Sequence, residues 1–346
     1  MFKLSMPSAA SLIMLLMLAT ALVDPAVYLT ANLTATKIST GITPVEKALL
    51  DRINGATISV DVAVDDFERI SLRDALIAAK QRGVTVRVVT DEEAHEIYAP
   101  HIAALTAVGI PIVDDQDSGG IMHNKYLIID HQLVWTGSTT LSDNDLTLNH
   151  SDSIVFNSTE VAHVFQQDFD QMTAGHFGSD KTASLITKLT YNGFLLEVYF
   201  SPQDNAMKQI IGEVETAARS IDFAISVFTE DPLRNALIAA HNRGVAIRGL
   251  WDALGAEDGS SDDEALCAAG IPIKIENTAG KMDHKLMIID AEGTKPRTIT
   301  GSLNWTSVAD NRNSENTVII HDQATTQGYA SAFQTMWHGI AAVPCH

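Results

Sequence analysis

Cysteine and basic side chains are scarce in this chain. Among its 346 residues, 23 lysines and arginines face 43 aspartates and glutamates, for a net charge of -20. Because nucleic-acid affinity rests on cations that neutralise phosphates, this balance argues against extended DNA or RNA binding, and also against adsorption to anionic membranes. A local cationic pocket for one phosphate stays compatible with it. The two cysteines, Cys267 and Cys345, either pair in an oxidising compartment or remain free thiols.

The N-terminus has the pattern of an export signal. Lys3 precedes an apolar run from Ala9 to Val23, and Ala19-Thr20-Ala21 offers a cleavage site. The run is shorter than the roughly 20 residues that a membrane-spanning helix needs. Residues 1–25 are therefore predicted to be a signal peptide, with an uncleaved anchor as the alternative. Either interpretation places the folded part outside the cytoplasm, secreted or periplasmic.

The chain repeats itself. Residues 72–84 read Leu-Arg-Asp-Ala-Leu-Ile-Ala-Ala-Lys-Gln-Arg-Gly-Val, and 233–245 read Leu-Arg-Asn-Ala-Leu-Ile-Ala-Ala-His-Asn-Arg-Gly-Val. A repeat of this length indicates two fused domains rather than a solenoid. Domains of ordinary size are predicted over residues 43–175 and 197–342. We expect a monomer with two pseudo-symmetric halves.

Strands and helices alternate within each half. Strands are predicted over residues 57–64, 84–89, 126–129 and 195–200, and helices over 72–81, 100–108 and 205–218, with 176–194 as the connection. Arg82-Gly83 supplies a basic last turn and a glycine stop to one helix. This order predicts an α/β fold with helices on the faces of each sheet.

One catalytic-looking motif occurs twice, and its two copies differ at the first position. The first copy contains His123, Asn124, Lys125, Asp130, Gly137 and Ser138; the second contains Asp283, His284, Lys285, Asp290, Gly301, Ser302 and Asn304. Side chains two positions apart share one face of a strand. His123 therefore projects with Lys125, and Asp283 with Lys285, whereas His284 faces the opposite side.

These residue types suit phosphodiester chemistry. Phosphodiester oxygens repel nucleophiles, so a site must supply positive charge and directed hydrogen bonds. Lys125 and Lys285 supply the charge. Further donors to the same oxygens are Ser138, Ser302 and Asn304. A neutral imidazole such as His123 can attack phosphorus and form a phosphohistidine, and a second acid must protonate the leaving oxygen and later accept a proton from water.

The H-x-K-x4-D motif followed by Gly-Ser, twice in one chain and with Asn313-Ser314-Glu315 downstream, resembles the phospholipase D superfamily. The resemblance covers residues 45–340, and residues 198–204 and 243–245 are similar to bacterial tandem members of its phospholipase D/nuclease branch. It implies two fused α/β/α sandwich halves with the site between them. It also implies phosphodiester hydrolysis or transfer without a metal or other cofactor, with His123 as the nucleophile.

The chain departs from the family pattern at three positions. Asp283 replaces the second histidine, Thr140 replaces the residue that matches Asn304, and Ser151 replaces the one that matches Glu315. Asp283 is expected to inherit the acid/base task, which requires that burial or an anion such as Glu315 raises its pKa. The alternatives are a degenerate second half and a bulge that turns His284 into the site.

The motif aspartates, Asp130 and Asp290, are expected to support the motifs by accepting hydrogen bonds at strand ends.

The predicted function is an exported phosphodiesterase that acts on phospholipids. Two alternatives stay open: an exported, metal-independent endonuclease, and a catalytically weakened protein that binds phosphate esters.

Overall fold

The computed structural model describes residues 25–341 except 31–41, 117, 277 and 279. The predicted export signal, apart from its last residue, and Cys345 lie outside the described residues. Cys267 is disulfide-bonded. In the described part of the chain, no helix has the length and apolarity to cross a bilayer.

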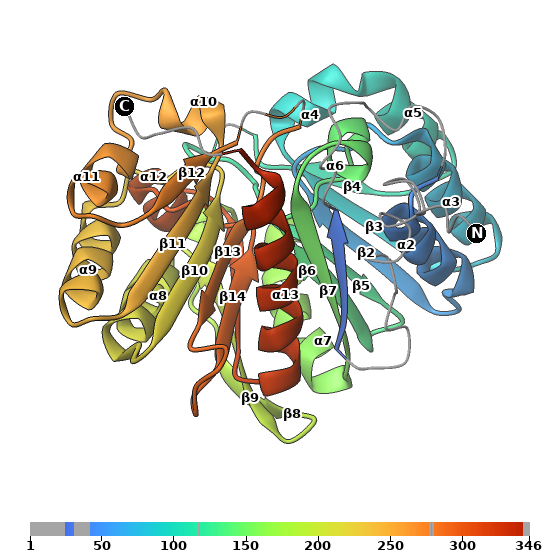
Figure 1. Ribbon diagram of the computed structural model, residues 1–346. Coiled ribbons are helices and arrows are strands. Elements are labelled where there is room, and N and C mark those ends of the chain that lie inside the picture. Colours follow the sequence, from blue (N-terminus) through green and yellow to red (C-terminus); the bar gives the residue numbers. More distant parts are fainter. Residues whose placement is uncertain (1–24, 31–41, 117, 277, 279, 342–346) are drawn as a thin grey trace, which may run out of the picture.

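Two sheets stand side by side, one per half (Figure 1). The first has the order β1-β7-β6-β5-β2-β3-β4 and is built from β1 (Ala26–Thr30), β2 (Ser59–Val64), β3 (Thr85–Thr90), β4 (Ile112–Asp114), β5 (Lys125–Ile129), β6 (Leu133–Gly137) and β7 (Ser151–Asn157). The second has the order β12-β11-β10-β13-β14-β15-β9-β8 and is built from β8 (Lys188–Tyr191), β9 (Phe194–Ser201), β10 (Ser220–Ile225), β11 (Ala246–Trp251), β12 (Ile273–Ile275), β13 (Lys285–Ile289), β14 (Arg297–Gly301) and β15 (Glu315–Ile320).

Helices cover both faces of each sheet. The first half has α2 (Pro44–Gly55), α3 (Ile70–Gln81), α4 (Glu92–Ile97), α5 (Ala99–Ala107), α6 (Asp143–Thr147), α7 (Thr159–Thr173) and the 3-10 turn η1 (Gly178–Asp180). The second has α8 (Ala206–Thr216), α9 (Asp231–Asn242), α10 (Ala253–Ala256), α11 (Asp263–Ala268), α12 (Ser307–Asn311) and α13 (Gln323–Gly339). Apolar residues of α7, α13 and both sheets form one shared core between the halves, and each half has a further core under its outer helices. The predicted fused α/β/α halves are confirmed.

The repeated segments fold alike. The glycine stops, Gly83 and Gly244, take left-handed φ values of 91° and 93° directly after α3 and α9. The predicted strands and helices are confirmed within a few residues. The predicted connection over 176–194 differs from the structure, because β8 lies within it and pairs with β9. The signal for β8 was Asn192-Gly193, a two-residue turn with φ values of 47° and 88° that joins β8 to β9 as a hairpin.

Candidate active site

The two halves exchange backbone hydrogen bonds at the start of each motif. The amide of His123 donates to the carbonyl of Ser314 at 2.9 Å, and the amide of Asp283 donates to the carbonyl of His150 at 2.8 Å. Each motif strand thus begins beside the last strand of the opposite sheet. The register brings His123 next to Glu315, the first residue of β15.

His123 is held by a carboxylate from the other half. Its Nδ1 lies 2.8 Å from Oε2 of Glu315, whose side chain is fully buried. The Ser302 hydroxyl donates to the same carboxylate at 2.6 Å, and the Asn313 amide donates to it at 3.1 Å. This network favours the tautomer with the proton on Nδ1 and leaves Nε2 of His123 as the free nucleophilic nitrogen.

Lys125 has an ion-pair partner that the sequence analysis missed. Asp65 follows β2, whose Val64 lies opposite Lys125 on β5. One Asp65 oxygen lies 2.9 Å from Nζ of Lys125, and the other lies 3.6 Å from Nε2 of His123. The available signal was an acidic residue at the end of the strand beside the motif strand, where the second half has Ser226.

Lys285 pairs with Asp283 in the second half. Its Nζ lies 2.7 Å from the Asp283 carboxylate, as expected for side chains on one strand face. Burial is the largest single influence and would raise the pKa of Asp283, but the Lys285 ammonium, together with Lys125 and His123, lowers it overall. The raised pKa that we expected of a general acid is therefore absent here, because the nearest charge is a cation. Lys125 and His123 also act on the Asp283 charge, so both halves contribute to one electrostatic site.

A second buried carboxyl, Asp145, faces the same site. Burial, and then the charge of Asp283, raise the pKa of Asp145 to about 7. The backbone amide and hydroxyl of Thr140 donate to Asp145 at 2.6 and 2.8 Å. Thr140 stands where the second half has Asn304, and its hydroxyl is thus already hydrogen-bonded to a side chain of the protein. In contrast, Oδ1 of Asn304 is buried without a hydrogen-bond partner.

His284 does not enter the site. It is fully buried on the opposite side of the strand, with Nδ1 2.8 Å from the buried carboxylate of Asp152 in the first half. Thr300 and Tyr329 donate to the other oxygen of Asp152. Burial raises the pKa of Asp152, but these hydrogen bonds, led by that of His284, lower it overall. In the described residues around His284, the structure shows no bulge that turns this histidine into the site. Its side chain instead contacts Asp152 and links the two halves.

The Gly-Ser turns bring their hydroxyls to carboxylates rather than into open space. The Ser138 hydroxyl donates to Asp152 at 3.3 Å, as that of Ser302 does to Glu315. Each preceding glycine is required, since a Cβ on Gly137 or Gly301 would lie 2.2 Å from a backbone oxygen of the neighbouring strand. Both serines therefore contact carboxylates, and the direct phosphate contact that we expected of them stays a prediction.

Asp130 and Asp290 lie at the far end of each motif strand from the lysines. Asp130 accepts backbone hydrogen bonds from residues 57–59 at 2.7 to 3.0 Å, and Asp290 accepts them from residues 218–220 at 2.7 to 3.0 Å. These contacts fix the start of the adjacent strand. Their placement matches the hydrogen-bonding role expected for them and not a contact with substrate.

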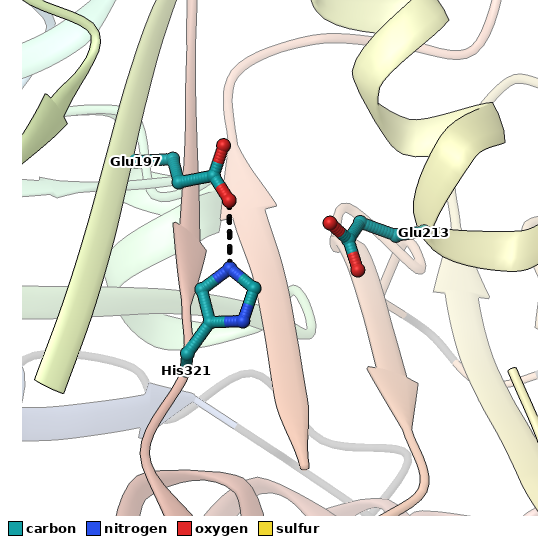
Figure 2. A group of neighbouring side chains, drawn as sticks. All are labelled: Glu197, Glu213 and His321. Atoms are coloured by element: carbon teal, nitrogen blue, oxygen red, sulfur yellow. Dashed lines mark hydrogen bonds and ion pairs between the residues drawn. The ribbon is translucent and has the colours of Figure 1, made fainter. Parts of the chain in front are cut away.

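One group of the described residues has the spacing of metal ligands. Possible ligand atoms of Glu197, Glu213 and His321 all lie within 4.8 Å of one another (Figure 2). The group lies at the end of β15 opposite to Glu315. Lys188 and Arg297 already pair with the two carboxylates at 2.7 and 2.5 Å. The protein's own cations thus neutralise this group, which is separate from the candidate active site.

Comparison with known proteins agrees with this geometry. The family model described as "Cardiolipin synthase, PLD-like domain" matches residues 49–173 and 210–337, more than half of the chain. A mitochondrial cardiolipin hydrolase of Chlamydomonas reinhardtii is 28% identical over 138 residues, which are 40% of this chain and 60% of that protein. A phospholipase D of Rickettsia conorii is 35% identical over 130 residues, or 38% of this chain and 63% of that protein. The chain thus matches less than two thirds of each relative.

A solved structure extends the likeness over both halves. Phosphatidylserine synthase of Haemophilus influenzae superposes with a TM-score of 0.66 over 86% of this chain and 85% of that one. Its sequence identity of 10% limits this likeness to the fold. With a family match in each half and a motif pair that meets across the two, the chain belongs to the phospholipase D superfamily.

Proposed function

We propose that the chain is an exported phosphodiesterase that hydrolyses phospholipids through a covalent phosphohistidine on His123. One observation carries the proposal: Glu315 holds Nδ1 of His123 at 2.8 Å and so directs Nε2 toward the side where Lys125 lies. A nucleophile, a fixed tautomer and a buried cation are the parts that attack on a phosphodiester requires.

In the first step, Nε2 of His123 attacks phosphorus, and the bond from phosphorus to the leaving oxygen breaks. Asp283 supplies the proton that the leaving alcohol takes. A phosphoryl oxygen that binds Lys285 weakens the pairing of this lysine with Asp283 and adds a negative charge beside it. Both effects raise the pKa of Asp283, so substrate binding itself prepares the acid.

In the second step, the roles reverse. Ionised Asp283 accepts a proton from water, the resulting hydroxide attacks phosphorus, and the bond from phosphorus to Nε2 breaks. His123 returns to its neutral form with Nδ1 still held by Glu315. Asp145 bears a proton below pH of about 7 and interacts with the Asp283 charge, so the two carboxyls titrate as a pair.

Lipid substrates and export rest on separate observations. The two relatives described above bear the names cardiolipin hydrolase and phospholipase D. The net charge of -20 disfavours a nucleic-acid substrate. The apolar N-terminal run and a disulfide at Cys267 support an oxidising compartment outside the cytoplasm.

The test offers phosphatidylcholine vesicles, cardiolipin vesicles and plasmid DNA side by side to the purified chain in EDTA, from acidic to neutral pH. We expect lipid hydrolysis and, with radiolabelled substrate, an acid-labile phosphoenzyme that His123→Ala abolishes while its circular dichroism is unchanged. Cleavage of DNA alone would identify a nuclease. Substantial turnover by His123→Ala, or activity only with an added divalent metal, would refute the proposed chemistry.

A second candidate function follows from the altered second motif. Lys125 and Lys285 each form an ion pair with a carboxylate of the protein, and the histidine of the second motif is absent. The absence of the second histidine removes an acid/base group that turnover needs and binding does not, so a phosphate-ester binding protein is the alternative. It predicts that calorimetry detects binding of a phosphodiester in the absence of any product, and that Lys125→Met and Lys285→Met abolish this binding.

A further inference from the structure

Asp65 lies in the space that the reacting phosphoryl group needs. Its carboxylate is 2.9 Å from Nζ of Lys125 and 3.6 Å from Nε2 of His123. Nε2 is the ring nitrogen that Glu315 leaves free, and a group poised for attack lies about 3 to 3.5 Å from its nucleophile. A phosphoryl oxygen bound to Lys125 must therefore share this lysine with Asp65.

Hydrogen bonding does not account for this position of Asp65. The Oδ1 atom of Asp65 is buried and accepts no hydrogen bond. It lies 2.9 Å from Nζ of Lys125, which is ion-pair distance. The contact is thus electrostatic. The matching position of the second half is Ser226, since Ile225 lies opposite Lys285 as Val64 lies opposite Lys125. An uncharged residue therefore suffices at this place in the fold.

Both lysines of the site are already paired with carboxylates before any substrate binds. Lys125 is paired with Asp65 and Lys285 with Asp283, while Glu315 holds His123. A phosphodiester brings one negative charge, whereas a phosphomonoester brings about two at neutral pH and above. Both lysines are almost fully buried, and charges interact far more strongly in such surroundings than in water. The second charge of a monoester meets the carboxylates of Asp65 and Asp283, with Glu315 and Asp145 behind them, and no further cation among the described groups of this site.

We propose that Asp65 is a specificity-determining residue that lets the site accept singly charged phosphodiesters and reject doubly charged phosphomonoesters, including the product of the reaction. This inference rests on the proposed phosphodiester site and adds its selectivity. Repulsion by Asp65 would speed the release of a monoester product and suppress phosphatase activity.

The test compares two ligands that differ by one methyl group and one charge: phenyl phosphate and methyl phenyl phosphate. Their binding is measured by calorimetry at about pH 8, where the monoester is doubly charged. The variants are Asp65→Ser, which copies Ser226, and Asp65→Asn. The control is Asp66→Asn, which removes a neighbouring negative charge. Burial, and then Asp65, raise the pKa of Asp66 only to about 6, so it is ionised in this experiment.

We expect both Asp65 variants to bind phenyl phosphate about tenfold more tightly or better, and methyl phenyl phosphate within about threefold of the wild type. Asp66→Asn should change the ratio of the two affinities clearly less than either Asp65 variant does, because Lys125 forms its ion pair with Asp65 and interacts with Asp66 only weakly. Circular dichroism and thermal unfolding show whether Asp65→Ser folds. If it does not fold, Asp65→Asn still tests the inference, because it removes the charge and keeps a polar group of the same size beside Lys125.

Three results would overturn the inference: equal tightening of both ligands, no tightening of the monoester, and the same shift in Asp66→Asn. Absence of binding in the wild type and in both Asp65 variants would overturn it as well. Failure of the proposed hydrolysis is a distinct result. In that case no phosphodiester yields product, while the ratio of the two binding affinities still tests the role of Asp65.

Discussion

Glu315 of the second half lies 2.8 Å from Nδ1 of His123 in the first half. The pair forms because His123 and Ser314 share a backbone hydrogen bond across the junction of the two sheets. Neither half contains both members, so the tautomer of the proposed nucleophile depends on correct packing of the halves. This dependence gives a direct test of the role of Glu315.

Glu315→Gln should lower kcat by about 10²-fold or more with little change in KM, because the glutamine amide can donate to Nδ1 and favour the wrong tautomer. Steady-state kinetics on a phospholipid and trapping of the phosphoenzyme measure the effect. Ser302→Ala, which removes a hydrogen bond to Glu315, should lower kcat less, and Ser138→Ala, on Asp152, should lower it least. Full kcat in Glu315→Gln would show that the carboxylate does not position His123.

Asp283→Asn should be severely impaired with phospholipids but much less so with a p-nitrophenol leaving group, which departs without a proton. For the wild type, kcat/KM on phospholipids should fall as pH rises, because Lys285 lowers the pKa of Asp283 in the free protein and its acid form disappears. We therefore expect an acidic pH optimum. Equal loss on both leaving groups would argue against proton donation by Asp283.

His284→Ala should destabilise the fold by about 3 kcal/mol, because it leaves the buried Asp152 carboxylate without its main partner. The folded-state pKa of Asp152 is lowered, so its stabilising effect is present above the unfolded pKa of about 4 and is lost as pH falls through the folded value. The difference in unfolding free energy between wild type and variant should therefore narrow in acid, as urea titrations would measure.

The control for His284→Ala is His163→Ala. His163 is exposed and its one side-chain hydrogen bond among the described residues is to Gln167, so its loss should change stability by less than about 0.5 kcal/mol. A stable His284→Ala with lost turnover would instead identify His284 as the second catalytic histidine.

Asp130→Asn should lower the free energy of unfolding by about 1 kcal/mol and leave kcat/KM within about threefold. Asparagine tolerates the left-handed φ of 54° at this position, but it replaces charge-assisted hydrogen bonds to residues 57–59 with weaker ones. Thermal unfolding and kinetics on one preparation separate the two quantities. A large loss of kcat/KM with unchanged stability would place Asp130 in the catalytic machinery.

Local sequence determined the repeated framework. Gly83 and Gly244 end matched helices because the left-handed conformation is cheap only for glycine, and the alternation of His123 with Lys125 fixes their common strand face. The duplication, the α/β fold and the family were therefore readable from residues close together in the chain.

Tertiary structure alone decided which charges meet. Asp65 joins Lys125 and His123 because of the strand register of the first sheet, and His284 reaches Asp152 only because the two sheets pack together. The pKa of Asp283 follows from a balance of burial against the nearby Lys285 charge, and this balance depends on distance and dielectric surroundings. Sequence spacing specifies neither the distances between these charges nor their dielectric surroundings. The motif therefore determined which reacting groups are present, and the packing of the halves determined the electrostatics around them.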